Sequence, residues 1–192
     1  MILDIFKTSI YKTSVNNKDY YDFFIDTLNN SLTEEEGKII SNVGGFQTKG
    51  FTENDFKNKN IFNDLFIEPA SYFLSSFKVK KQFKINNFYF WINKNYPKTF
   101  NKVHTHGNNK ISGVYYLEVP PQSGSLVFQN GDNIKLFSEG TFDDPNFYSS
   151  YTIVPKKFDL ILFFSETLHY VEPNFSNEDR ISVAFNIDIT NN

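Results

Sequence analysis

The chain has 192 residues, of which 40% are hydrophobic and 21% charged, and its formal net charge is −3 at pH 7. These values suit one folded domain with a sizeable core and give no reason to expect nucleic acid as a partner. The sequence has no cysteine, which excludes disulfides, thiolate metal sites and a cysteine nucleophile. Any metal must therefore be bound by His, Asp or Glu. No secretory signal and no membrane-spanning apolar run is evident, so we expect a cytoplasmic protein.

The first third of the chain is expected to be mostly helical. Residues 2–15 alternate loosely and suggest a strand, whereas residues 19–28 place aromatic and apolar side chains at helical spacing. Residues 33–36, a threonine followed by three glutamates, resemble a helix N-terminus. A second helical stretch is expected at residues 61–77, and Pro69 should kink or divide it.

From about residue 83 onwards, short runs of β-branched and aromatic residues alternate with turn signals. This texture is typical of a sandwich or barrel. Asn130-Gly131 between two of the runs is a type I′ hairpin signal. We therefore expect a single domain over residues 1–192, with a helical part to about residue 80 and a mainly-β barrel over about 83–190. The expected strands are residues 83–92, 111–119, 125–129, 134–137, 151–154, 160–164, 169–172 and 181–189.

The last expected strand divides its side chains between two faces. The odd-numbered residues of 181–187 are bulky and apolar, whereas the even-numbered residues are small or polar and include one arginine. This division fits a barrel wall, with the apolar face toward helices or a second sheet and the mixed face toward a cavity. The residues of the mixed face are Arg180, Ser182, Ala184 and Asn186.

The three histidines of the chain fall in two places. His104 and His106 are separated by one residue, so on a strand both would point to the same face. His169 follows the most apolar of the expected strands. Two ligands from one strand and a third from a distant strand can occupy one face of an octahedron and leave the other face open. Non-haem iron oxygenases use this arrangement, usually with a carboxylate as the third ligand. The His-x-His spacing alone is equally compatible with surface or core histidines.

Arg180 provides a second signal, because it begins the mixed face of its strand and Ser182 follows on the same side. A planar guanidinium beside a hydroxyl is a good receptor for a carboxylate deep in a barrel. The alternative is a surface ion pair between Arg180 and Glu178 or Asp179.

Together these segments resemble the prolyl-4-hydroxylase-like branch of the 2-oxoglutarate/Fe(II) oxygenases, in particular its small bacterial and phage members. The resemblance covers residues 83–190, in the family's order, and matches the helical first third only loosely. It implies a double-stranded β-helix, the jelly-roll barrel shared with cupins. It also implies a dioxygenase that uses Fe(II), 2-oxoglutarate and O2, hydroxylates its substrate and releases succinate and CO2. The resembling segments are residues 104–106, 111–117, 124–128, 154–155, 159–164, 169–173 and 180–186.

The resemblance also assigns roles to single residues. His104 and His169 match the two histidine ligands of the family, and His106 stands where the family usually has Asp or Glu. Arg180 matches the arginine that pairs with the distal carboxylate of 2-oxoglutarate, and Ser182 completes the Arg-x-Ser pattern.

Two further residues are candidates for contacting the co-substrate. Tyr116 matches the second tyrosine of a Tyr-Tyr-Leu strand, and Asn93 lies before the histidine pair. A core aromatic is the alternative role for Tyr116, and a purely structural role is the alternative for Asn93.

A histidine at position 106 changes the expected charge of the site. Two histidines and one carboxylate leave Fe(II) with a net charge of +1, whereas three neutral histidines leave it at +2, which should favour anionic 2-oxoglutarate. Three-histidine iron sites also occur in cupin-type dioxygenases that do not use 2-oxoglutarate, so this class stays open. So does a cupin-like barrel that binds a metal or small ligand without oxidation. Glu166 or Asp159, near His169 in sequence, could instead lend a carboxylate.

The substrate is not evident from the sequence: peptidyl proline, a free amino acid and another small metabolite all stay open. Residues 138–150 form a long connection that we interpret as a lid or substrate loop, with a plain surface loop as the alternative. We expect a small-molecule or peptidyl substrate, no nucleic-acid or membrane partner, and leave a homodimer open as the assembly.

Overall fold

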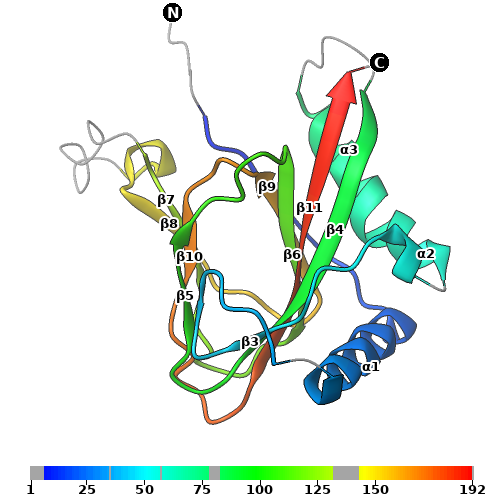
Figure 1. Cartoon of the computed structure of the whole chain (residues 1–192). Helices are drawn as coiled ribbons and strands as arrows, with labels where there is room; N and C mark the ends of the chain where they lie inside the picture. The colour runs from blue at the N-terminus through cyan, green and yellow to red at the C-terminus, as the bar shows by residue number, and fades with distance from the viewer. Residues whose placement is uncertain (1–6, 35, 57, 78–82, 132–142, 192) are drawn as a thin grey trace, which may run out of the picture.

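Two antiparallel sheets face each other in the computed structural model, and helices cover the outer side of one of them (Figure 1). The structure describes residues 7–34, 36–56, 58–77, 83–131 and 143–191. This mainly-β architecture with helices near the N-terminus agrees with the fold expected from the sequence. Within the described residues, no helix is long and apolar enough to cross a membrane.

The larger sheet, here called the large sheet, has six strands in the order β1-β9-β6-β11-β4-β3. Its long central pair, β11 and β4, is antiparallel and places Arg180 opposite Asn95 and Ser182 opposite Asn93. In chain order the strands are β1 (Ile10–Ser14), β3 (Phe46–Gln47), β4 (Phe83–Asn95), β6 (Ile111–Glu118), β9 (Asp159–Phe164) and β11 (Arg180–Asn191).

The opposing sheet, here called the small sheet, has five strands in the order β2-β5-β10-β7-β8. The chain changes from the small to the large sheet between β2 and β3, where Gly44 has a φ of 75°, a conformation that glycine adopts without strain. In chain order the strands are β2 (Asn42–Val43), β5 (Phe100–His104), β7 (Leu126–Gln129), β8 (Ser150–Ile153) and β10 (His169–Val171).

The longest helix, α1 (Lys18–Glu34), begins after Asn17, whose side-chain oxygen accepts the backbone N–H of Asp19 at 3.0 Å. The prediction that residues 33–36 start a helix is wrong, because residues 33 and 34 are the last two residues of α1. Glu34 is thus the last residue of a helix rather than part of a first turn.

The second predicted helix is divided just before Pro69, as its sequence suggests. A π-helical turn at Asn63–Ile67 lies between α2 (Lys59–Phe62) and α3 (Glu68–Ser75), and Pro69 stands in the first turn of α3. In this turn the N–H of Glu68 donates to the carbonyl of Asn63, five residues back. This wider turn precedes Pro69, which has no backbone N–H to donate to a helical hydrogen bond. In the described part of the chain, the remaining helical elements are two short 3₁₀ turns, Glu53–Asp55 and Pro145–Phe147.

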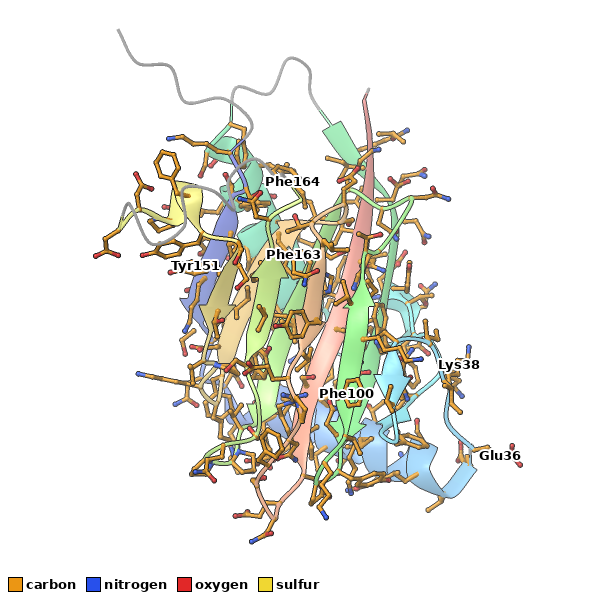
Figure 2. All side chains as sticks on the ribbon, turned by 90° about the vertical axis from the view of Figure 1, so that its left-hand side faces the viewer. Glu36, Lys38, Phe100, Tyr151, Phe163 and Phe164 are labelled. Atoms are coloured by element: carbon orange, nitrogen blue, oxygen red, sulfur yellow. The ribbon has the colours of Figure 1, made fainter. Side chains whose placement is uncertain are left out.

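Two apolar clusters hold these layers together. The larger cluster lies between the helices and the outer face of the large sheet and is rich in phenylalanine, while a smaller one lies between the sheets. Two neighbouring residues of β9, Phe163 and Phe164, contribute to different clusters (Figure 2). Phe164 packs on Phe73 of α3 in the larger cluster, and Phe163 packs on Phe128 of β7 in the smaller one, each pair with ring centroids 5.0 Å apart. Because β9 is buried on both faces, its sequence after Asp159 is continuously apolar rather than alternating.

Most of the expected strands are present within one or two residues of their predicted bounds. The hairpin at Asn130-Gly131 is an exception and is a wrong prediction. Strand β7 pairs with β8, which begins only at Ser150, and on its other side with β10. Neither Asn130 nor Gly131 has the positive φ that a type I′ turn requires. The predicted strand at residues 134–137 and residues 138–142 of the proposed lid lie outside the described residues. The remainder of the proposed lid contains the 3₁₀ turn at Pro145–Phe147 and the first residue of β8.

Candidate metal centre and co-substrate cavity

Two of the three histidines are brought together by strand pairing. Strands β5 and β10 are antiparallel neighbours, and His104 is the direct partner of His169. Directly opposed residues of a sheet project their side chains to the same face. The two imidazole ring centroids are 4.3 Å apart, and His169 is buried with 3% of its surface exposed.

His106 lies just beyond the end of β5, so the prediction of two histidines on one strand holds only for His104. Its backbone N–H donates to the carbonyl of Ser165 at 2.9 Å, and its ring stacks on Trp91 at a centroid distance of 5.6 Å. The ring nevertheless reaches the same place, with its centroid 5.2 Å from that of His104 and 5.0 Å from that of His169.

The three histidines form a group with the geometry of a metal site. Each offers one ring nitrogen, and these ligand atoms lie within 4.8 Å of one another. Among the residues that the structure describes, no carboxylate belongs to the group. Asp159 accepts the N–H of Lys156 at 2.8 Å and pairs with Lys12 at 2.7 Å, and Glu166 is exposed. The suggestion that one of these two acids replaces a histidine therefore finds no support in the geometry.

Hydrogen bonds fix which nitrogen of each ring is free. Nδ1 of His104 lies 2.6 Å from the carbonyl oxygen of Lys102, and Nδ1 of His169 lies 2.8 Å from that of Thr167. A carbonyl oxygen can only accept, so Nδ1 carries the proton in both rings and Nε2 keeps its lone pair. This is the arrangement in which histidine binds metals.

Burial keeps all three rings neutral at physiological pH. It lowers the pKa of His104, lowers that of His106 to about 4 and lowers that of His169 to about 3. In each case loss of solvent is the largest cause and outweighs the hydrogen bond that Nδ1 donates. Each neutral ring therefore keeps one nitrogen lone pair, which is available to a cation without a proton having to be displaced.

A cavity between the two sheets joins the histidines to the other residues singled out in the sequence. The polar face of β11 faces this cavity, as its alternation predicts, and residues of β4 and β6 line it on the same sheet, with residues of β5, β7 and β10 on the opposing sheet. All seven candidate residues line it: His104, His106, His169, Arg180, Ser182, Tyr116 and Asn93.

Arg180 is the most unusual of these residues, because its cation is buried with 1% of its surface exposed. Nη1 donates to the carbonyls of Ser123 at 2.7 Å and Gly124 at 3.2 Å, which fixes the guanidinium. Nη2 is buried and has no hydrogen-bond partner, and within the described part of the chain no carboxylate forms an ion pair with Arg180. Asp179, a partner considered from the sequence, pairs with Lys94 instead. A buried unpaired cation is costly, so this cavity has the character of an anion site.

Three polar side chains surround this cation. Ser182 is buried and lies opposite Asn93 in the pairing of β11 with β4, and the Oδ1 atom of Asn93 is buried without a partner. Tyr116 is buried, and burial raises its pKa to about 12, so the hydroxyl keeps its proton and can donate. The cavity thus offers more hydrogen-bonding groups than the protein itself uses.

Two residues of the metal centre, Asn186 and Trp91, were not predicted from the sequence. Asn186 was placed on the cavity face without a role, and its Oδ1 lies 2.6 Å from Nδ1 of His106. Trp91, the single tryptophan of the chain, stacks on the same ring. Its position two residues before Asn93, hence on the same face of the strand, was the available signal.

A groove opens on the other side of the histidines. It shares Ser41, Trp91, His104 and His106 with the cavity, so the two hollows meet at the metal centre. Tyr89, which stacks on Trp91 at 5.7 Å, extends the aromatic wall. The groove is also lined by two exposed residues, Lys38, which is labelled in Figure 2, and Ile40.

Comparison with known families agrees with this geometry. The model of the family described as "Putative 2OG-Fe(II) oxygenase" matches residues 89–186, just over half of the chain. The chain belongs to this family of 2OG-Fe(II) oxygenases. The protein is therefore a 2-oxoglutarate-dependent Fe(II) oxygenase, and its family uses Fe(II), 2-oxoglutarate and O2. No curated protein sequence matches this oxygenase.

Solved structures share the fold of this oxygenase at low sequence identity. A prolyl-4-hydroxylase from Pseudomonas putida is 14% identical, with a TM-score of 0.67 over 94% of this chain and 92% of that one. A prolyl hydroxylase from Trichoplax adhaerens is 13% identical, with a TM-score of 0.62 and coverage of 94% and 82%. HygX from Streptomyces hygroscopicus is 11% identical, with a TM-score of 0.56 and coverage of 94% and 83%. At these identities the likeness shows the fold alone, the jelly roll expected from the sequence.

The residues of the centre fit the groups that the family uses. Three neutral imidazole nitrogens are suitable ligands for Fe(II), and the unpaired Nη2 of Arg180 offers an anion a charged donor. These donor atoms are the reason that the site suits Fe(II) and an anionic co-substrate.

Proposed function

We propose that this oxygenase hydroxylates an organic substrate while 2-oxoglutarate is converted to succinate and CO2. One oxygen atom of O2 enters the substrate as a hydroxyl group, and the other enters succinate. Bound Fe(II) supplies the redox chemistry for this reaction. The observation that carries the proposal is the buried, unpaired Arg180 in the same cavity as the three histidines. A barrel that only binds a metal has no need of such a cation.

In the proposed site, Nε2 of His104, His106 and His169 hold the metal on one side. Their neutrality leaves the full +2 charge of the ion, which favours an anionic co-substrate. Histidine in place of the more usual carboxylate at position 106 is thus compatible with 2-oxoglutarate, whose two carboxylates bring the missing negative charge.

Arg180 is proposed to bind the distal carboxylate of 2-oxoglutarate through Nη2. We propose that the hydroxyl groups of Ser182 and Tyr116, which line the same cavity, donate to this carboxylate and that Asn93 makes a fourth contact. Because the cavity is enclosed by both sheets, these contacts operate away from bulk water and are stronger for it. Their role is to orient the co-substrate so that its other end faces the histidines.

The substrate is proposed to approach through the groove bounded by Tyr89, Trp91 and Ile40, which meets the cavity at the histidines. Related folds accept ligands of different kinds: the Trichoplax enzyme was solved with a peptide fragment and HygX with hygromycin B. A small-molecule or peptidyl substrate therefore stays our proposal for this enzyme. We further propose a single domain over residues 1–192, a cytoplasmic location and no nucleic-acid or membrane partner, with a homodimer still open as its assembly.

The proposal is tested by measuring succinate formed from 2-oxoglutarate in air with Fe(II), using wild-type protein, Arg180→Leu and Lys94→Leu. The Lys94 side chain pairs with Asp179, the residue before Arg180. Lys94→Leu is therefore a matched control for removing a cation near the site. We expect slow succinate formation by the wild type even without added substrate, a similar rate for Lys94→Leu, and loss of activity in Arg180→Leu through a raised KM for 2-oxoglutarate. Equal KM values in all three proteins would contradict the assigned role of Arg180.

A further inference from the structure

His106 depends on other side chains for its orientation, unlike the two other histidines of the centre. It lies beyond the last residue of β5, so strand pairing does not fix its ring. His104 and His169 donate their Nδ1 protons to backbone carbonyls, whereas Nδ1 of His106 faces the side-chain oxygen of Asn186 at 2.6 Å. The orientation of this one ligand can therefore be changed by substituting another residue.

Asn186 is itself tightly held. It lies on β11 with 3% of its surface exposed, and its Oδ1 also accepts a hydrogen bond from the hydroxyl of Ser112 at 2.7 Å. Its Nδ2 donates to the hydroxyl of Tyr89 at 2.7 Å. Ser112 in turn lies 2.8 Å from the hydroxyl of Ser165, the residue whose carbonyl accepts the backbone N–H of His106. In this arrangement the amide oxygen faces the imidazole and Ser112, whereas the amide nitrogen faces Tyr89.

The direction of the amide decides whether His106 can bind a metal. An amide oxygen only accepts, so it requires the proton on Nδ1 and leaves the lone pair on Nε2. A reversed amide would present an N–H group, move the imidazole proton to Nε2 and block that atom as a ligand. Trp91, stacked on the ring at an interplanar angle of 28°, limits its tilt but has no influence on the tautomer.

We propose that Asn186 is the positioning residue for His106: its amide oxygen holds the Nδ1–H tautomer and turns Nε2 toward His104 and His169. The inference rests on the proposed metal site. Because the acceptor is a neutral amide rather than a carboxylate, it orients the ring without adding negative charge. Asn186 thus helps to keep the centre at the +2 charge that three neutral histidines allow.

Two substitutions separate orientation from charge. Asn186→Ala removes the acceptor, and loss of such an outer partner typically costs about 10- to 100-fold in metal affinity. Asn186→Asp keeps an acceptor for Nδ1–H and adds a negative charge next to the ring, which should make His106 a stronger donor. We therefore expect Asn186→Asp to bind Co(II) at least as tightly as the wild type and to shift the visible absorption bands of bound Co(II).

The direct test uses metal-free protein labelled with ¹⁵N-histidine, in which NMR identifies the protonated nitrogen of each ring. We expect His106 to carry its proton on Nδ1 in the wild type and to lose this preference in Asn186→Ala, with His104 and His169 unchanged. The matched control is Asn174→Ala, which removes a fully buried asparagine away from the histidines and should leave all three tautomers unchanged. An unaltered His106 tautomer together with wild-type Co(II) affinity in Asn186→Ala would overturn the proposal.

A double substitution provides the second test, and it also decides the matter if Asn186→Ala does not fold. In a His106→Asp background there is no Nδ1–H to hold, so Asn186→Asp should no longer shift the Co(II) bands. If Asn186→Asp shifts the Co(II) bands equally in the wild-type and His106→Asp backgrounds, Asn186 does not act through His106. If it shifts the bands in neither background, the proposal is also contradicted. These outcomes are distinct from failure of the proposed function, in which wild-type protein with Fe(II) would form no succinate although the His106 tautomer is as expected.

Discussion

His104 and His169 are direct partners across the antiparallel strands β5 and β10. Their relative position follows from backbone hydrogen bonding, and both donate Nδ1–H to backbone carbonyls. The ring of His106, beyond the strand end, contacts the side chains of Asn186 and Trp91 instead. The centre therefore consists of two ligands fixed by the sheet and a third whose contribution can be tuned.

This division predicts how single substitutions rank. We expect His104→Ala and His169→Ala to lose Co(II) or Fe(II) affinity by more than the roughly 10- to 100-fold that an outer partner contributes. His106→Ala should lose less, because the two strand-fixed ligands stay in place. Anaerobic calorimetric titration measures all three. Unchanged affinity in His106→Ala, with circular dichroism showing a folded protein, would remove His106 from the ligand set.

His106→Asp tests the charge of the centre. An aspartate here lowers the net charge with Fe(II) from +2 to +1, so the metal should attract anionic 2-oxoglutarate less strongly. We expect metal binding to be retained and the Kd for 2-oxoglutarate to rise. Turnover at saturating 2-oxoglutarate that equals or exceeds the wild-type value would further place residue 106 on the metal. If neither metal affinity nor the Kd for 2-oxoglutarate changes, residue 106 is not a ligand.

The buried histidines should make the metal-free protein sensitive to acid. Burial lowers the pKa of His106 to about 4 and that of His169 to about 3, whereas the same side chains in the unfolded chain take up protons near pH 6.5. Between these values the unfolded state binds more protons than the native state, so stability falls as the pH falls.

For each histidine with a lowered pKa, the equilibrium constant for folding falls by up to about tenfold per pH unit as the pH drops from 6.5 to that pKa. Urea unfolding at pH 7 and pH 5 measures the loss, and His169→Gln isolates one contribution, since glutamine does not titrate. We expect a smaller loss between the two pH values in the variant. The same loss in both proteins would show that His169 is not a buried neutral imidazole.

Trp91 gives a spectroscopic report on the centre because it is the single tryptophan and stacks on His106. Binding of Co(II) or Ni(II), whose partly filled d shells accept excitation energy, should quench most of its fluorescence. Zn(II), with a filled d shell, is the matched control and should quench far less. Saturating Co(II) that leaves the emission unchanged would place the metal away from this ring.

Much of the site could be predicted because its chemistry depends on rare residues at regular spacings. With three histidines and no cysteine, few metal sites are available, and the alternation of β11 assigned Arg180 and Ser182 to the cavity face. The same alternation in β4 could have indicated Trp91, but a tryptophan on a strand usually belongs to the core. The role of Asn186 depends on the position of His106 in three dimensions, which no spacing in the sequence encodes.

The errors in the fold occur where the local sequence preference differs from the packing of the folded chain. Residues 33–36 carry the composition of a helix start, but burial of the apolar face of α1 extends that helix through residues 33 and 34. Asn130-Gly131 has the composition of a tight turn, yet both edges of β7 are already occupied by β8 and β10. In each case packing between distant segments outweighed a local preference that would be marginal alone.

The central claim is that the three histidines and Arg180 form one site for Fe(II) and 2-oxoglutarate, and anaerobic titration tests it most directly. Fe(II) is added to metal-free protein, followed by 2-oxoglutarate, while visible absorption is recorded. We expect a charge-transfer band that saturates at one equivalent of iron, is absent in His169→Ala, and disappears with release of succinate when air is admitted. A wild-type protein that develops no band and forms no succinate would contradict the claim.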